Sequence, residues 1–158
     1  MTQTRAALES VRAFTLMGRA GMAIVLSCIL LGGAAYASSN EANDVAQSMR
    51  AIWDRPDAPL TVDPIVVEGD YALAGWTQQA RGGRALLLRR DGRWQVHVCG
   101  GDGLTDIEAL KMAGMSEPAA RRLAEAANKA EAKLPERTRE KFASFGQNVL
   151  VSGGHAPH

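Results

Sequence analysis

The chain contains little cysteine, few aromatic residues and no excess of either charge. Its 158 residues include 2 Cys, and Phe, Trp and Tyr together make up 5%. The 18 Lys and Arg nearly balance the 17 Asp and Glu, which leaves a formal net charge of +1. A balanced charge provides no basic face for phosphates, so we expect no nucleic acid among the partners. Hydrophobic residues make up 46%, which excludes a disordered chain.

The one long apolar run lies near the N-terminus. Three arginines precede residues 20–31, and small residues follow and end in Ala-Tyr-Ala at residues 35–37. A basic segment, a short apolar core and an Ala-x-Ala site are typical of a secretory signal peptide. We therefore predict that residues 1–37 are a signal peptide, cleaved before Ser38, and that the protein is periplasmic.

Two other interpretations of this leader stay open. The stretch from Ala20 to Ala37 reaches the lower length limit of a membrane span, so an uncleaved leader would anchor the protein in the membrane. The sequence around Cys28 also loosely resembles a lipoprotein processing site, although apolar residues follow it where a polar tether is typical. We expect membrane contact only through an uncleaved leader.

Cleavage of the leader leaves a single thiol. Cys28 departs with residues 1–37 and Cys99 remains, so no disulfide can form within the mature chain. Exported proteins face an oxidising compartment. A lone thiol there is buried and inert, bridged to another molecule, or bound to a metal.

The remaining residues predict one α+β domain over residues 38–151. Apolar residues recur at helical spacing over residues 40–54, and two prolines end that pattern. Strand-like runs separated by glycine-containing turns, one of them at Gly82-Gly83, fill residues 62–99. They predict a four-stranded antiparallel meander. Its first strand lies at an edge, because Pro64 has no N–H to donate to a neighbour.

Helical patterns return over residues 105–145, where apolar residues again lie on one face. We predict that these C-terminal helices cover one side of the sheet and that the N-terminal helix crosses the other. Such a domain is cystatin-like or NTF2-like in shape. Residues 152–158 are rich in glycine and polar groups, and we expect them to form a flexible tail.

The Asp91-Gly92 turn predicts a register for the last two strands. A two-residue loop and regular pairing place Arg84 opposite Cys99. Because side chains alternate along a strand, His97 and Cys99 are expected to point to the same face.

His97 and Cys99 are the principal candidates for a metal site. Imidazole and thiolate are good donors to Cu(I) and Zn(II), and alternate strand positions lie about 7 Å apart. Arg84 opposite the thiol, and the helix start that follows it, both favour the thiolate. On the other interpretation, Cys99 packs as a small apolar residue and His97 only edges the sheet.

Four further side chains are candidate metal donors. Met112 and Met115 carry thioethers, and His155 and His158 carry imidazoles. Each also has a plainer explanation. The two methionines can simply pack in the core or lie exposed on the surface. The two histidines can belong to a tail that binds no metal.

Several motifs resemble a known family. They are Ala51-Ile52-Trp53-Asp54-Arg55-Pro56, Leu60-x-Val62-x-Pro64-Ile65-Val66-Val67-x-Gly69-x-Tyr71-Ala72, Gly75-Trp76, Gly82-Gly83-Arg84-Ala85-Leu86-Leu87 and Trp94-x-Val96-x-x-Cys99-x-Gly101-Asp102-x-Leu104. Over residues 50–150 the chain resembles the bacterial copper uptake system-associated protein family, whose members are small exported proteins. The resemblance implies a periplasmic accessory of copper handling that acts beside a membrane copper importer.

The free thiol and the resemblance together predict a protein that binds or relays copper ions in the periplasm. One alternative is a non-metal envelope scaffold that binds a protein partner through an open sheet face. A thiol enzyme is a second alternative, but a Cys–His nucleophile also needs an orienting group and an oxyanion hole. We therefore expect no catalytic activity.

Overall fold

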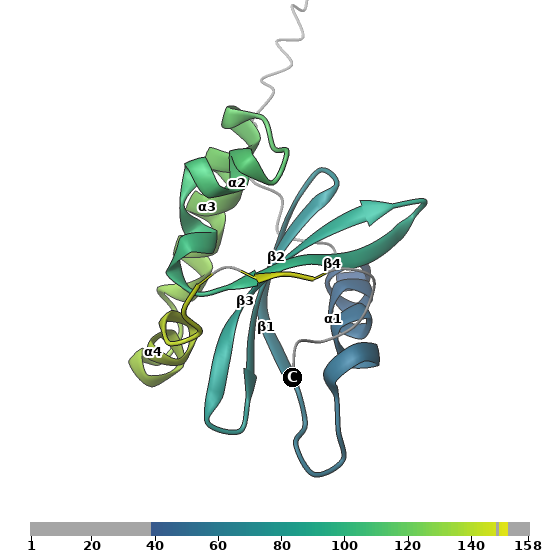
Figure 1. Ribbon diagram of the computed structural model, residues 1–158, viewed down its shortest axis with the longest axis vertical. Helices are drawn as coiled ribbons and strands as arrows, with labels where there is room; N and C mark the ends of the chain where they lie inside the picture. The colour runs from purple at the N-terminus through teal and green to yellow at the C-terminus, as the bar shows by residue number, and fades with distance from the viewer. Residues whose placement is uncertain (1–38, 148, 152–158) are drawn as a thin grey trace, which may run out of the picture. The chain divides into compact units, whose positions relative to one another are not determined.

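The structure is a computed structural model that describes residues 39–147 and 149–151. Helix α1 (Ser39–Trp53) comes first, within one residue of the predicted helix at each end. Five strands form the sheet: β1 (Thr61–Glu68), β2 (Tyr71–Gln78), β3 (Arg81–Arg90), β4 (Arg93–Gly100) and β5 (Val149–Leu150). Between β4 and β5 lie the 3-10 helix η1 (Asp102–Thr105) and the helices α2 (Ile107–Met112), α3 (Glu117–Glu131) and α4 (Glu136–Ala143). The α+β prediction is confirmed (Figure 1).

Some predictions fall outside the described residues. They are the signal peptide over residues 1–37, the tail over residues 152–158, and the two tail histidines, His155 and His158. Within the described part of the chain, no helix combines the length and apolar character that a bilayer crossing requires.

The sheet is an antiparallel meander with the strand order β1-β2-β3-β4-β5. Pro64 lies in β1 at the edge of the sheet, as predicted. The prediction of four strands missed β5, which pairs with Val98 and Cys99 of β4. Two residues are too few to show an alternating pattern, so the sequence gives no sign of this strand.

The sheet separates two apolar layers. Figure 1 shows α1 on one side of the sheet and α3 and α4 on the other. Leu86 and Leu87 are neighbours in β3 and both are fully buried, yet they belong to different layers. Burial on both faces explains why the middle of β3 is a continuous apolar run and does not alternate.

The predicted turn at Gly82-Gly83 is wrong. Both glycines lie inside β3, and the hairpin turn is formed by Gln79 and Ala80. Gln79 adopts the left-handed conformation there, with a φ of 55°. The glycines are needed for a different reason, which is close packing.

Two glycines on the sheet allow α4 and the segment just after it to pack closely against the sheet. A Cβ on Gly75 would lie 2.6 Å from the tip of the Phe142 ring in α4. A Cβ on Gly83 would lie 2.9 Å from the Phe145 ring, just after α4. These contacts are too short for a real Cβ, so only glycine lets the two rings approach the sheet this closely.

We expect Gly75→Ala to lower the free energy of unfolding by about 1–3 kcal/mol, because the new methyl group would overlap the buried Phe142 ring. Urea denaturation measures the change. Gly69→Asn is the control, since Gly69 has positive φ but open space around it and asparagine tolerates that conformation. An equal loss for both variants would show that α4 does not depend on the contact at Gly75.

Candidate functional site

β4 contains a bulge at the predicted site. The pairing of β3 with β4 follows the predicted register as far as Val96 and then shifts by one residue, so that His97 is the extra residue. Cys99 therefore pairs with Ala85, and the prediction that it faces Arg84 is wrong. A hairpin turn determines the register only while both strands stay regular, and the bulge ends that regularity.

The shift places Cys99 on the α1 side of the sheet. Cys99 is 6% exposed and belongs to the same apolar layer as Val96, whereas Val98 belongs to the opposite layer. His97 is half-buried and lines a hollow whose wall also includes Ile52 of α1. Because of the bulge, regular alternation no longer determines the side to which His97 points relative to Cys99.

Two hollows open between α1 and the sheet. The first, named the His97 hollow, has a volume of about 460 Å³ and includes His97, Trp94 and Val151 in its wall. The second, named the Cys99 hollow, has a volume of about 550 Å³ and includes Cys99 in its wall. Ile52 borders both hollows, but His97 lines only the first and Cys99 only the second.

Aromatic rings line the Cys99 hollow. Trp53 comes from α1, Trp76 from β2, and Phe145 from the segment after α4. Trp76 and Phe145 pack edge to face, with their ring centroids 5.6 Å apart. The thiol therefore borders a space whose wall combines these aromatic rings with polar residues, among them Arg55 and Arg81.

A glutamine holds the wall of this hollow in place. The Gln78 side-chain amide donates to the carbonyl oxygen of Trp53 at 2.8 Å and to that of Ala58 at 2.7 Å. These bonds tie the C-terminal end of α1 and the following loop to β2. Because the carbonyl groups at a helix end need donors, the same contact also stabilises the end of α1.

Burial raises the pKa of the Cys99 thiol to about 12. The thiol is therefore protonated at neutral pH, and the prediction that its surroundings favour the thiolate is wrong. The expected cation, Arg84, lies on the other side of the sheet, where it contacts Glu131 of α3.

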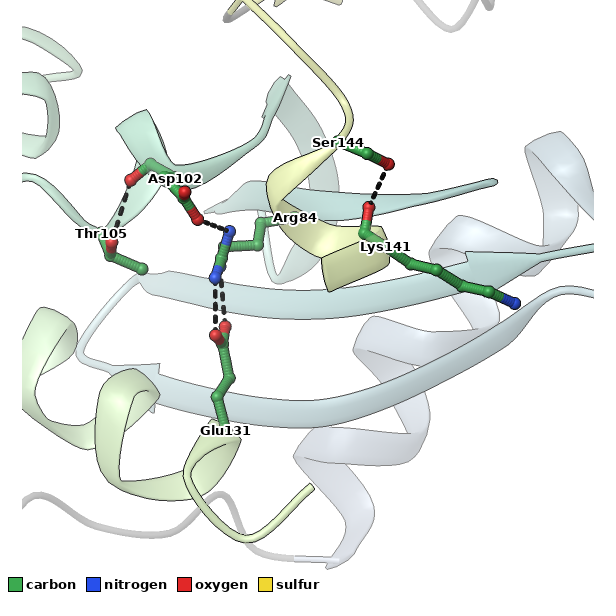
Figure 2. Close-up of polar contacts among 6 residues, drawn as sticks. All are labelled: Arg84, Asp102, Thr105, Glu131, Lys141 and Ser144. Atoms are coloured by element: carbon green, nitrogen blue, oxygen red, sulfur yellow. Dashed lines mark hydrogen bonds and ion pairs between the residues drawn. The ribbon is translucent and has the colours of Figure 1, made fainter. Parts of the chain in front are cut away.

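Arg84 forms a buried ion network, drawn in Figure 2. Its Nε and Nη2 donate to the two carboxylate oxygens of Glu131 at 2.8 and 2.6 Å, and its Nη1 donates to Asp102 at 3.0 Å. The guanidinium also lies 5.6 Å from the centroid of the Phe142 ring. Burial by itself would lower the pKa of Arg84, but the hydrogen bonds and charges of Glu131 and Asp102 raise it.

The network joins three parts of the fold. Arg84 belongs to β3, Glu131 to the last turn of α3, and Asp102 to the start of η1. Thr105 donates its hydroxyl to the Asp102 carbonyl oxygen at 2.9 Å, and Figure 2 shows this bond beside the ion pairs. The result is a charged cross-link between the sheet and the C-terminal helices.

Sequence reasoning did not find Glu131, although a signal was present. Leu123, Ala127 and Glu131 are spaced four residues apart on α3, and all three are buried. An acidic residue on an otherwise apolar helix face requires a buried partner. The sequence cannot name that partner, because Arg84 lies 47 residues away.

The two methionines do not join Cys99 and His97. Met112 is 84% exposed at the end of α2, and Met115 is buried in the apolar layer on the opposite side of the sheet from Cys99. Among residues 39–147 and 149–151, no group of three or more His, Cys, Asp or Glu side chains is placed to hold a metal ion.

Comparisons with family models, curated proteins and solved structures find no significant match to the chain. The resemblance drawn from its motifs therefore stays a hypothesis, and its function has to be argued from its own residues.

We expect Glu131→Ala to lower the free energy of unfolding by about 3–5 kcal/mol, because it leaves the Arg84 guanidinium buried without its main partner. Replacing both residues, Arg84→Met with Glu131→Leu, should recover most of that loss. Arg121→Ala is the control, since it removes only an exposed ion pair and should change stability by less than about 0.5 kcal/mol. Urea denaturation that gives similar values for Glu131→Ala and Arg121→Ala would contradict a structural role for the network.

Alkylation by iodoacetamide tests the state of the thiol. At pH 8 we expect Cys99 in the native protein to react about a thousandfold more slowly than in the unfolded chain. The reason is that the fraction of reactive thiolate falls about tenfold for each unit by which the pKa of the thiol rises. The same protein in guanidinium chloride provides the reference rate. Native and unfolded rates within a factor of ten of one another would mean that the thiol is not buried in its protonated form.

Proposed function

We propose that the protein is an exported accessory of copper handling that binds or relays copper ions through Cys99. The observation that carries the proposal is that Cys99, the one thiol outside the predicted leader, is buried in the apolar layer on the α1 side and also borders a hollow. The motif resemblance supports copper as the metal and a membrane copper importer as the partner. The predicted signal peptide supports a periplasmic location.

The surroundings of Cys99 favour a soft, singly charged ion. Cu(I) prefers sulfur donors, and it accepts few ligands. The faces of Trp53 and Trp76 in the same hollow attract cations through their π-electrons. Arg55 and Arg81 border the same hollow, so the negative charge of the thiolate is needed to balance the charge of the bound Cu(I).

Binding would displace the thiol proton. Because burial holds the pKa of Cys99 near 12, the metal must compete with a proton at neutral pH. Cu(I) has enough affinity for thiolate sulfur to do so, whereas a harder ion does not. The buried thiol therefore selects for a thiophilic metal, and it leaves the empty site unreactive towards oxidants.

A chelator competition tests this proposal. We expect Cys99→Ser to weaken Cu(I) binding by more than about tenfold, because a hydroxyl is a poor donor to a soft ion. The measurement is the transfer of Cu(I) between the purified protein and a coloured Cu(I) chelator under anaerobic conditions. Met112→Leu, which removes an exposed thioether far from the hollow, is the matched control and should leave the affinity unchanged.

A second candidate function is supported by the low exposure of Cys99, which is 6%. On this candidate the thiol only packs, and the protein is an envelope scaffold whose partner binds over the hollows on the α1 side of the sheet. The chelator competition separates the two candidates. Equal Cu(I) affinity of the wild type and Cys99→Ser would favour the scaffold.

A further inference from the structure

We infer that the Cys99 hollow is a binding site for a small organic carboxylate with a flat, apolar body. In this site Arg55 and Arg81 bind the carboxylate group, and the aromatic rings of the same wall pack against the body of the ligand. The inference goes beyond the proposed function, because it needs neither a metal nor the thiol of Cys99.

The register of β2 and β3 places Arg81 on the same side of the sheet as Trp76. Trp76 and Gln78 are two positions apart in β2, so their side chains lie on one face. Arg81 pairs directly with Gln78, and paired side chains of antiparallel strands share a face. Trp76 packs against the apolar layer on the α1 side, so this face is the α1 side. The hairpin thus brings a guanidinium and an indole into the wall of one hollow.

Arg55 comes from the loop after α1. The Ala58 N–H donates to the Arg55 carbonyl oxygen at 3.1 Å, which closes a tight turn. Gln78 holds this turn on β2, since its amide donates to the Ala58 carbonyl oxygen. The backbone of both arginines is therefore fixed before a ligand binds, and only their side chains lose freedom on binding.

The charge of the hollow favours an anion. Both arginines are exposed, and neither forms an ion pair with a residue that the structure describes. Within the described part of the chain, no Asp or Glu lines this hollow. Asp54, which precedes Arg55, accepts a hydrogen bond from the Leu60 N–H at 2.6 Å. A guanidinium presents paired N–H donors whose geometry matches a carboxylate, which makes a carboxylate the expected anion.

The other part of the wall is aromatic. Trp53, Trp76 and Phe145 line the hollow, and flat apolar groups pack well on such rings. The volume of about 550 Å³ falls within the range of about 300–1,000 Å³ that is typical of small-molecule sites. Such sites combine apolar walls with a few polar groups that orient the ligand. The His97 hollow suits this ligand less well, because its wall includes one arginine and one tryptophan.

The test measures binding of 2-naphthoate to the purified, metal-free protein by isothermal titration calorimetry. We expect one molecule to bind, about tenfold or more tightly than 2-naphthamide, which has the same rings but no charge. Arg55→Gln and Arg81→Gln should each weaken the binding of 2-naphthoate by about fivefold or more. Arg90→Gln is the matched control, since Arg90 lies at the other end of β3 and lines the His97 hollow. Its affinity for 2-naphthoate should equal that of the wild type.

Three results would overturn the inference. They are equal affinity for 2-naphthoate and 2-naphthamide, wild-type affinity in both Arg55→Gln and Arg81→Gln, and no detectable binding at about 1 mM 2-naphthoate. Both arginines are exposed, so the circular dichroism spectrum of the variants should match that of the wild type.

Cys99→Ser separates this inference from the proposed function. The variant should lose Cu(I) binding and keep the wild-type affinity for 2-naphthoate. Wild-type Cu(I) binding by Cys99→Ser would refute the copper proposal alone. Failure of the wild-type protein to bind 2-naphthoate, with Cu(I) binding that depends on Cys99, would refute the carboxylate site alone.

Discussion

The ion pair between Arg84 and Glu131 determines how charge is distributed on the two sides of the sheet. Arg84 stands in the middle of β3, and its two carboxylate partners lie on the side covered by the C-terminal helices. A buried guanidinium is stable only where such partners surround it. The α1 side of the central strands is therefore left without the charge of Arg84, and burial raises the pKa of the Cys99 thiol there.

The bulge at His97 determines that the thiol of Cys99 lies on the α1 side of the sheet. Without the extra residue, Cys99 would face Arg84 and share a surface with charged groups. With it, sulfur and imidazole come from the same strand but line two different hollows. This division is why the proposed copper site rests on Cys99 and not on Cys99 and His97 together.

Much of the fold could be predicted from local patterns, and the site could not. The helical period of α1, the turn at Asp91-Gly92 and the proline in β1 act over a few residues, and their consequences were predicted correctly. The turn predicted at Gly82-Gly83 is wrong because a glycine for a turn and a glycine for close packing look the same in a sequence. The bulge has no sequence signal of its own, so it displaced the predicted partner of Cys99.

The central claim is that copper binds to the sulfur of Cys99, and X-ray absorption at the copper edge tests it most directly. The Cu(I)-loaded protein should show a short sulfur scatterer in the first coordination shell, and Cys99→Ser should lose it while the fold is retained. A first shell made only of nitrogen and oxygen in the wild-type protein would contradict the account.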